Sequence, residues 1–564
     1  MTRSELIRTV TEDYLEEIKQ NPPPPDELQA QLLERTNLAI EAENAKKPKS
    51  ERWRKLADLE LTQISQIMLS LHPIIRVRSA NSIPKYDLLA VYMKDGENMG
   101  IYDTEAESFN VIAKSYNRSL KIMDCKEITA DLKEKAPRAE RCRDEDLIAV
   151  NNGIFNYRTK QLLPFSKNYI FLSKSRVNYN PYAANVVIHN DADGTDWDVE
   201  SWMKELSDDE GIVNLLWEIM GAVIRPHVHW NKSAWFYSES GNNGKGTLCS
   251  LMRNLCGSGT YASIPLSDFG KEFMLEPLIH ASAIIVDEND VGGYIDRAAN
   301  LKAIITNDVI QLNRKHQSPV SYQFFGFMVQ CLNEMPRIRD RSDSFYRRQL
   351  FVPFTKCFTG HERRYIKADY LKRKEVLEYV LARVLHMNYY ELSEPEACRN
   401  ALAEYKEFND PIRQFMTEME QLFVWDLLPF GFLYDLYRAW FRQNFPSGTV
   451  TGRNSFIRDL VSMIGDFPEW HCPGRNVTIR PAGRMDAAEP MIAEYNLVVW
   501  MNPLQRGRCS SQNLDVLCRP LIKTGYNGLL RRVPKLTGTH HACTGSNVPD
   551  IMNTDPETGI IGGK

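Results

Sequence analysis

The sequence predicts a multidomain α/β protein built around a nucleotide-binding core, and two observations predict this class. The apolar run Trp235–Tyr237 leads into a polar loop with three glycines and then into an amphipathic segment. This is the pattern of a strand, a phosphate-binding loop and a helix. Two later apolar runs end in polar side chains, one at Asp287-Glu288 and one at Asn333. Such runs are typical of buried strands that present functional groups at their carboxyl ends.

The composition sets limits on what the protein does. A length of 564 residues predicts several domains, and a hydrophobic content of 43% is ordinary for a globular protein. The net charge of −4 excludes a basic field over the whole molecule, so any nucleic-acid site must be a local patch. Eleven cysteines without a paired framework indicate reduced thiols and a cytoplasmic protein. No apolar run is long enough to span a bilayer, so no membrane partner is expected.

The first 200 residues predict two regions before the core. Residues 1–70 have helical periodicity and form a helical N-terminal segment, and residues 71–200 form a mixed α+β domain. Within the second region, residues 88–102 predict paired strands around a Gly-containing turn, and residues 147–157 predict a hairpin around an Asn-Gly turn. No spaced pair of carboxylates on strands precedes residue 200, so no two-metal primase site is predicted there.

The predicted ATPase core covers residues 201–360, where a helical run leads into the glycine loop. Small residues allow backbone N–H groups to close around an anion, and a lysine reaches the outer phosphates. The loop departs from the usual pattern, because Glu239 replaces its first glycine and Gly246 follows the lysine where Ser or Thr is usual. A Gly/Asn turn that caps a core helix is the alternative. The predicted nucleotide-binding residues are Gly241, Asn242, Asn243, Gly244, Lys245, Gly246 and Thr247.

The acidic pair at the end of the run 280–286 supplies the two groups that nucleotide hydrolysis needs. Asp287 can hold a magnesium ion through its water shell, and Glu288 can orient and deprotonate the attacking water. A core strand that ends in a charged turn is the alternative. Asn333 ends the next buried run, and from there its amide can sense the γ-phosphate through the attacking water.

A predicted hairpin with a basic tip lies between the two strands, over residues 309–322. Its tip contains Arg314, Lys315 and His316. These side chains are either solvated charge or, on a ring-shaped motor, a contact to DNA phosphates in the central channel.

The order of these elements resembles that of the superfamily 3 helicases, in the branch of the phage/plasmid-primase and poxvirus helicase-primase proteins. The resemblance covers roughly residues 145–360 and rests on the motifs Asn243–Thr247, Ile285–Asn289, Asn313–His316, Asn333–Pro336 and Arg347-Arg348. It implies an AAA+-like P-loop ATPase core that binds ATP and Mg²⁺, forms a ring that is usually a hexamer, and moves 3′ to 5′ on single-stranded DNA.

The resemblance also implies roles for single residues. Gly244 and Lys245 match the phosphate-binding loop, Asp287 and Glu288 the acidic strand, and Asn333 the sensor amide. Lys315 and His316 match the DNA-contacting hairpin, and Arg348, rather than Arg347, matches the arginine finger. Thr247 would supply the magnesium contact in place of the missing hydroxyl after the lysine. Residues 306–308, Thr-Asn-Asp, stand where the family has Gly-Gly-Asp.

The remaining chain predicts three further regions. Residues 361–425 form a helical connector, and residues 426–504 resemble a winged-helix-like domain, in which Arg453 and Arg458 either contact phosphates or lie on a solvated helix face. Residues 505–564 are rich in Gly, Ser, Asn, Thr and Pro and predict a flexible tail.

The sequence therefore predicts an ATP-dependent DNA helicase for replication of a phage, virus or mobile element. Its expected partners are single-stranded or forked DNA, further copies of the chain, and a separate primase or polymerase. Two alternatives stay open. The first is a non-helicase P-loop NTPase motor or switch, and the second is an origin-binding scaffold that has little catalytic activity.

Overall fold

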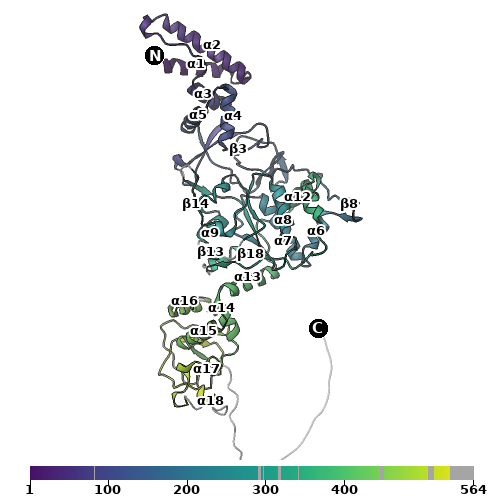
Figure 1. The fold of residues 1–564 in the computed structure, drawn as a ribbon, viewed down its shortest axis with the longest axis vertical. Coiled ribbons are helices and arrows are strands. Elements are labelled where there is room, and N and C mark those ends of the chain that lie inside the picture. Colours follow the sequence, from purple (N-terminus) through teal and green to yellow (C-terminus); the bar gives the residue numbers. More distant parts are fainter. Residues whose placement is uncertain are drawn as a thin grey trace, which may run out of the picture. The chain divides into compact units, whose positions relative to one another are not determined.

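The computed structural model describes residues 1–81, 83–289, 294–295, 298–315, 319–338, 340, 342–444, 450–505 and 514–533. The chain divides into two compact units, Met1–Asn409 and Asp410–Lys564 (Figure 1). The boundary between them falls inside the range 361–425 that the sequence suggests is a connector. The architecture is mixed α/β with a parallel sheet in the first unit.

The first unit begins with a helical module that packs on a small sheet. The helices of this module begin with α1 (Arg3–Ile18), α2 (Pro25–Asn44) and α3 (Leu61–Leu71). Thr2 and Glu5 form a capping box at the start of α1, and Pro25 is the first residue of α2. The rest of the module consists of α4 (Ala106–Tyr116), α5 (Ile122–Lys135) and the sheet β3-β2-β1-β4, with strands Tyr102–Asp103, Leu88–Tyr92, Ile74–Val77 and Arg138–Ala139.

Short antiparallel strands connect this module to the core. They are β5 (Leu147–Val150), β6 (Gly153–Asn156), β7 (Gln161–Leu163), β8 (Ile188–Asn190) and β9 (Thr195–Trp197). The predicted hairpin is present, but Val150 pairs with Gly153, so the two turn residues are Asn151 and Asn152. Gly153 is the first residue of β6, where a Cβ atom would lie 2.5 Å from the Leu163 carbonyl oxygen. The glycine is therefore required by close strand packing and not by the turn.

The core of the first unit is a five-stranded parallel sheet of order β11-β12-β16-β10-β18. Alternate side chains of its strands face opposite layers of helices. Phe236 and Val329 pack in the cluster that includes α7, α8 and α12, and Trp235 and Met328 pack in the cluster that includes α9 and α13. The strands are Tyr261–Ala262, Ala283–Val286, Phe327–Leu332, Ser233–Tyr237 and Gln349–Pro353.

The helices of this core are α6 (Val199–Glu205), α7 (Glu210–Ile224), α8 (Lys245–Cys256), α9 (Ala298–Ile305), α10 (Asp343–Tyr346), α11 (Arg364–Ala368), α12 (Lys374–His386) and α13 (Glu396–Asn409). Two further strand pairs lie beside the sheet. β13 (Tyr294–Ile295) pairs with β17 (Arg337–Ile338), and β14 (Val309–Leu312) pairs with β15 (Val320–Gln323).

The second unit has its own aromatic core, in which Phe415, Tyr437 and Phe456 stack closely. Its helices are α14 (Pro411–Met419), α15 (Phe430–Asn444), α16 (Arg453–Met463), α17 (Met491–Glu494) and α18 (Leu514–Leu517). They accompany the antiparallel sheet β19-β21-β20, with strands Leu427–Pro429, Gly528–Arg531 and Trp470–His471. The middle strand, β21, comes from the range predicted to be a flexible tail.

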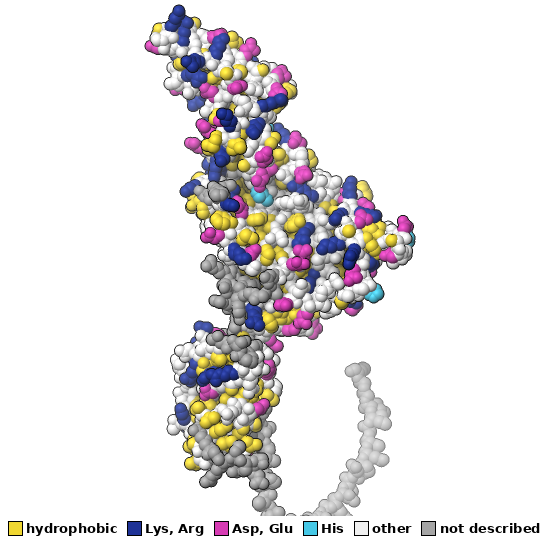
Figure 2. All heavy atoms as spheres, viewed as in Figure 1, with side chains coloured by type: hydrophobic (Ala, Val, Ile, Leu, Met, Phe, Trp, Pro, Cys, Tyr) yellow, Lys and Arg dark blue, Asp and Glu magenta, His cyan; other side chains and the backbone are white. Residues whose placement is uncertain are grey.

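The surface agrees with the small net charge. Basic and acidic side chains are interspersed over the face drawn in Figure 2. Among the helices that the structure describes, none is both long enough and apolar enough to cross a bilayer.

Candidate nucleotide-binding site

The glycine loop lies between the end of β10 and the start of α8, as its sequence predicts. Asn242 has φ 52° and Gly244 has φ 88°, so the loop turns through the left-handed region twice. A Cβ atom on Gly244 would lie 2.6 Å from Leu206 Cδ2, which excludes a side chain there. The Phe358 backbone N–H donates to the Asn242 carbonyl at 2.7 Å and fixes the outer part of the loop. The loop thus presents the N-terminus of a twelve-residue helix, which favours an anion.

Lys245 is buried at the first position of α8, with 4% of its surface exposed. Its Nζ donates to the Leu332 carbonyl at 2.8 Å, to Asn333 Oδ1 at 2.9 Å and to the Ser238 carbonyl at 3.2 Å. Burial lowers the pKa of Lys245. The structure therefore brings two of the predicted catalytic residues, Lys245 and Asn333, into direct contact.

Asp287 follows the last residue of β12 at the same edge of the sheet. Because all five strands are parallel and β16 lies between β12 and β10, the ends of these three strands carry Asp287, Asn333 and the glycine loop side by side. Glu288 is exposed next to Asp287. The carboxylate and amide groups predicted from the sequence thus converge on the N-terminus of α8.

Arg253 on α8 holds Asp287 through two hydrogen bonds of 2.7 and 3.1 Å. The guanidinium lowers the pKa of Asp287, which keeps that carboxyl ionised at neutral pH. Arg253 was not among the residues predicted from the sequence. It lies eight positions after Lys245 and two helical turns further along α8, a spacing that could have suggested a residue on the same face.

Lys367 on α11 is a second residue that the sequence analysis missed. Its Nζ lies 3.7 Å from the position a Cβ atom would take on Gly246, and its charge helps to lower the pKa of Asp287. Asn242 Nδ2 also donates to Glu362 Oε1 at 3.1 Å, so the segment that leads into α11 lies against the loop. No local pattern marks Lys367, because only the tertiary fold brings α11 to the loop.

The donor set suits a magnesium ion held largely through its waters. Asp287 offers an ionised carboxylate, and the half-buried Thr247 lies in the first turn of α8. Within the described residues, the Thr247 hydroxyl has no hydrogen-bond partner. Glu239, which stands where a glycine is usual, is exposed and accepts a hydrogen bond from the Tyr237 hydroxyl at 3.0 Å. Its side chain therefore contacts the last residue of β10.

The basic hairpin is formed by β14 and β15, where Leu312 pairs with Val320. Arg314 is 22% exposed and forms an ion pair of 3.7 Å with Glu276. Lys315 is exposed, and its backbone N–H donates to Glu276 Oε2 at 3.4 Å. His316 lies outside the described residues. Glu276 thus positions the start of the tip, and Lys315 is the described side chain that is free to meet a ligand.

Arg348 lies at the amino ends of the parallel strands, whereas Lys245 lies at their carboxyl ends. It directly precedes β18, and its carbonyl accepts a hydrogen bond from the Ser233 N–H at 2.8 Å, at the start of β10. The length of β10, five residues of about 3.3 Å each, separates this end from the glycine loop. Arg348 Nη1 donates to Ser344 Oγ at 2.8 Å. Arg348 is therefore remote from the nucleotide loop of its own chain.

Residues 5–207 match the D5 N-terminal-like family. A second model, a family of unknown function named DUF5906, matches residues 236–348. The first match spans the N-terminal module and ends just before α7. The second begins within β10 and ends at Arg348, so it contains Lys245, Asp287, Glu288, Asn333 and the basic hairpin. No curated protein matches the sequence.

Solved structures show a distant similarity. One structure of the NrS-1 C-terminal region (305–718) without ligand shares 13% identity, covers 75% of this chain and 96% of its own, and has a TM-score of 0.42. An A-form structure of the same region also shares 13% identity, covers 84% of this chain and 100% of its own, and has a TM-score of 0.42.

Proposed function

We propose that this protein is an ATP-dependent DNA helicase of the superfamily 3 type that acts in replication of a phage, virus or mobile element. The observation that carries the proposal is the convergence of Lys245, Asp287 and Asn333 at one edge of a parallel sheet. The strand order, in which the strand that ends in Asn333 lies between the loop strand and the acidic strand, supports an AAA+-like core. The match of residues 5–207 to the D5 N-terminal-like family supports the replication context.

The site residues divide the work of hydrolysis among themselves. The N-terminus of α8 and Lys245 bind the phosphates of ATP, and Lys245 exchanges its present carbonyl and amide acceptors for phosphate oxygens. Asp287 and Thr247 would hold the magnesium ion, which supplies charge neutralisation between the phosphates when bound. Glu288 orients and deprotonates the attacking water, and Asn333 positions that water beside it.

The assembly and the DNA contact belong to the same proposal. Arg348 cannot reach the loop of its own chain, so it acts as an arginine finger on a neighbouring copy in a ring, with six copies as the expected number. Lys315, together with Arg314 and His316, contacts the phosphates of single-stranded DNA in the channel. A separate primase or polymerase would use the strand that the ring exposes.

ATP hydrolysis and unwinding by the purified chain test this function. We expect DNA-stimulated ATPase activity and unwinding of a fork with a free 3′ tail, both abolished by Lys245→Ala. Circular dichroism of the variant shows whether it remains folded. Wild-type protein that neither binds nor hydrolyses ATP would contradict the proposal and favour an origin-binding scaffold. ATP hydrolysis without any response to forked DNA would instead indicate a non-helicase motor or switch.

A further inference from the structure

The hairpin is attached to the N-terminal module along one side of β15. The Ala80 N–H donates to the Ser321 carbonyl at 3.1 Å, and Asn81 Nδ2 donates to Ser321 Oγ at 2.8 Å. Arg141 Nη1 donates to the Tyr322 hydroxyl at 2.7 Å. The hairpin therefore contacts the segment 78–81 that follows β1, and groups on the module lie close to the hairpin.

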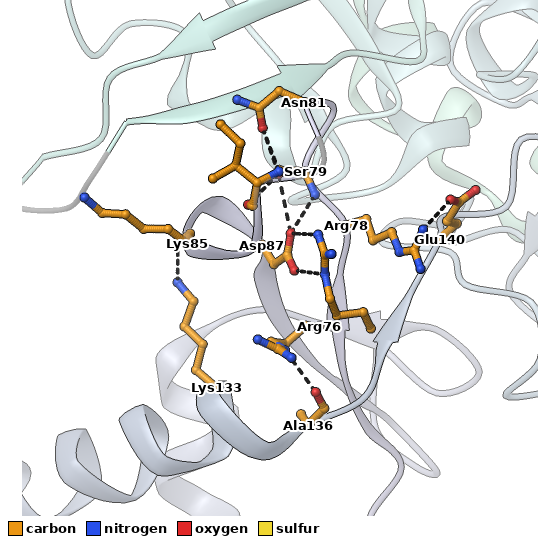
Figure 3. A network of polar contacts seen from close by, with 11 residues as sticks. Arg76, Arg78, Ser79, Asn81, Lys85, Asp87, Lys133, Ala136 and Glu140 are labelled. Carbon is orange, nitrogen blue, oxygen red and sulfur yellow. Dashed lines mark hydrogen bonds and ion pairs between the residues drawn. The ribbon is translucent and has the colours of Figure 1, made fainter.

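Three cations of the module gather beside this attachment (Figure 3). Lys133 on α5 donates from Nζ to the Lys85 carbonyl at 3.2 Å, and Arg76 on β1 donates from Nε to the Ala136 carbonyl at 2.9 Å. Burial lowers the pKa of Lys133, and the nearby charges of Arg314 and Arg76 lower it further, whereas the charge of Asp87 opposes this shift. The hairpin cation Arg314 is thus close enough to the module to repel Lys133.

The neighbouring carboxylates are paired with other cations, although the charge of Asp87 is felt by Lys133. Asp87 accepts two hydrogen bonds from Arg138, at 2.6 and 3.1 Å, and a third from the Ser79 N–H at 3.1 Å. Glu140 pairs with Arg78 on the other side of β1 (Figure 3). Across the described part of the chain, Arg76, Lys85 and Lys133 form no ion pair. Arg76 and Lys133 are partly buried and Lys85 is exposed, and an anion that binds among these like charges lowers the cost of their mutual repulsion.

We propose that the phosphate backbone of single-stranded nucleic acid binds across Arg76, Lys85 and Lys133 and continues onto the hairpin. The inference rests on the proposed function, because the hairpin is taken to contact DNA. A chain of phosphates fits better than a single anion, since the cations come from three separate segments and lead toward Lys315. Tyr86, half-buried beside Lys85, adds a ring of the kind on which bases stack.

The binding of a fluorescein-labelled thirty-nucleotide oligothymidine, followed by fluorescence anisotropy between 50 and 200 mM salt, tests this surface. The Arg76→Gln/Lys133→Gln double variant should bind about ten-fold more weakly, and its slope of log affinity against log salt should fall by roughly 1.4, about 0.7 for each lost phosphate contact. The control is Lys135→Gln, which removes the same charge from α5 at a lysine already paired with Asp131. It should bind as the wild type does.

Two further variants keep the test decisive if the double variant folds poorly. Lys85→Gln changes an exposed side chain and should lower the slope by about half as much. Lys133→Arg keeps the positive charge and should bind the oligonucleotide as the wild type does. An unchanged slope in Lys85→Gln and in the folded double variant would overturn the inference while wild-type unwinding upholds the proposed function. Wild-type protein that does not bind the oligonucleotide would overturn both.

Discussion

At the scale of single residues, the site is defined by cations that share a small space. Lys245, Arg253 and Lys367 come from two helices near the carboxyl ends of the central strands, and only the first two have acceptors among the described residues. Lys245 donates hydrogen bonds to main-chain carbonyls and to Asn333, and Arg253 donates to Asp287. Lys367 has no hydrogen bond or ion pair among the described residues. The free cation is the one best placed to meet a ligand without first breaking a contact.

Lys367→Ala should therefore weaken ATP binding and leave the fold intact. Because the exposed ammonium lies over the first turn of α8, its loss removes one charge from the phosphate site, and we expect KM for ATP to rise about ten-fold. Steady-state ATPase assays measure this. Lys372→Ala, an exposed lysine just beyond α11, is the matched control, and an equal effect of both variants would argue against a phosphate contact.

A buried histidine gives the first unit a defined response to acid. His227 packs between Phe171 and Phe325, and burial lowers its pKa to about 3. Between the ordinary pKa of 6.5 and pH 3, the unfolded chain binds a proton that the folded chain excludes. Stability is thus complete above pH 6.5 and falls below it, by at most about 1.4 kcal/mol per pH unit from this group.

The urea midpoint of the wild-type protein should consequently decrease from pH 6.5 to pH 5, and His227→Gln should flatten that decrease. The exposed His361→Gln should leave the decrease unchanged. Parallel profiles for the wild type and His227→Gln would show that folding does not lower the pKa of His227.

At the scale of elements, the basic hairpin combines a fixed base with a charged tip. Glu276 and the N-terminal module hold its residues, whereas Lys315 is exposed. Under the proposed function, the exposed tip is the part of the hairpin that contacts DNA.

The Lys315→Ala/His316→Ala variant should lose most unwinding of forked DNA, and that loss should exceed any loss of DNA-independent ATP hydrolysis. The reason is that, under the proposed function, these side chains contact phosphates of DNA and take no part in nucleotide binding. Parallel unwinding and ATPase assays check this. An equal loss of both activities would place the hairpin in the ATPase site instead.

The sequence predicts an element correctly where a single segment contains both the apolar run and the turn residues that define the element. The loop between β10 and α8, the strand before Asp287 and the 88–103 hairpin all have their turn residues and apolar runs together. β21 was missed because the average composition of 505–564 conceals the short run Gly528–Arg531. Its position depends on β19, where a Cβ on Gly528 would lie 2.1 Å from the Leu428 carbonyl oxygen, and no local pattern contains that contact.

The same distinction applies to the candidate site. Lys245, Asp287 and Asn333 each follow a strand, so their meeting at one edge follows from parallel strand order. Lys367 and the pairing of Arg253 with Asp287 depend on how helices pack on the sheet, which periodicity does not specify.

At the scale of the whole molecule, each of the two units has its own hydrophobic core. All predicted nucleotide and hairpin residues lie in the unit Met1–Asn409. Arg348 lies at the opposite end of the parallel strands from the glycine loop, so under the proposed function a neighbouring copy would supply this arginine to the site.

Mixing two inactive variants tests whether Arg348 completes a neighbour's site. Lys245→Ala and Arg348→Ala should each lack ATPase activity, but an equimolar mixture that exchanges subunits should recover a fraction of it. In mixed rings, an intact loop from one variant meets an intact arginine from the other. A mixture that stays inactive after exchange, shown by fluorescence transfer between labelled chains, would contradict action between subunits.

The attachment of Ser321 to Ala80 and Asn81 has a mechanical consequence. A hairpin that moved alone would have to break these bonds on every cycle of hydrolysis, so the hairpin and the N-terminal module would travel together as one lever. The movement would then involve the β-sheet of the module as well as the two short strands β14 and β15. The stiffness of residues 74–81 would determine how much of this movement is passed on to the DNA.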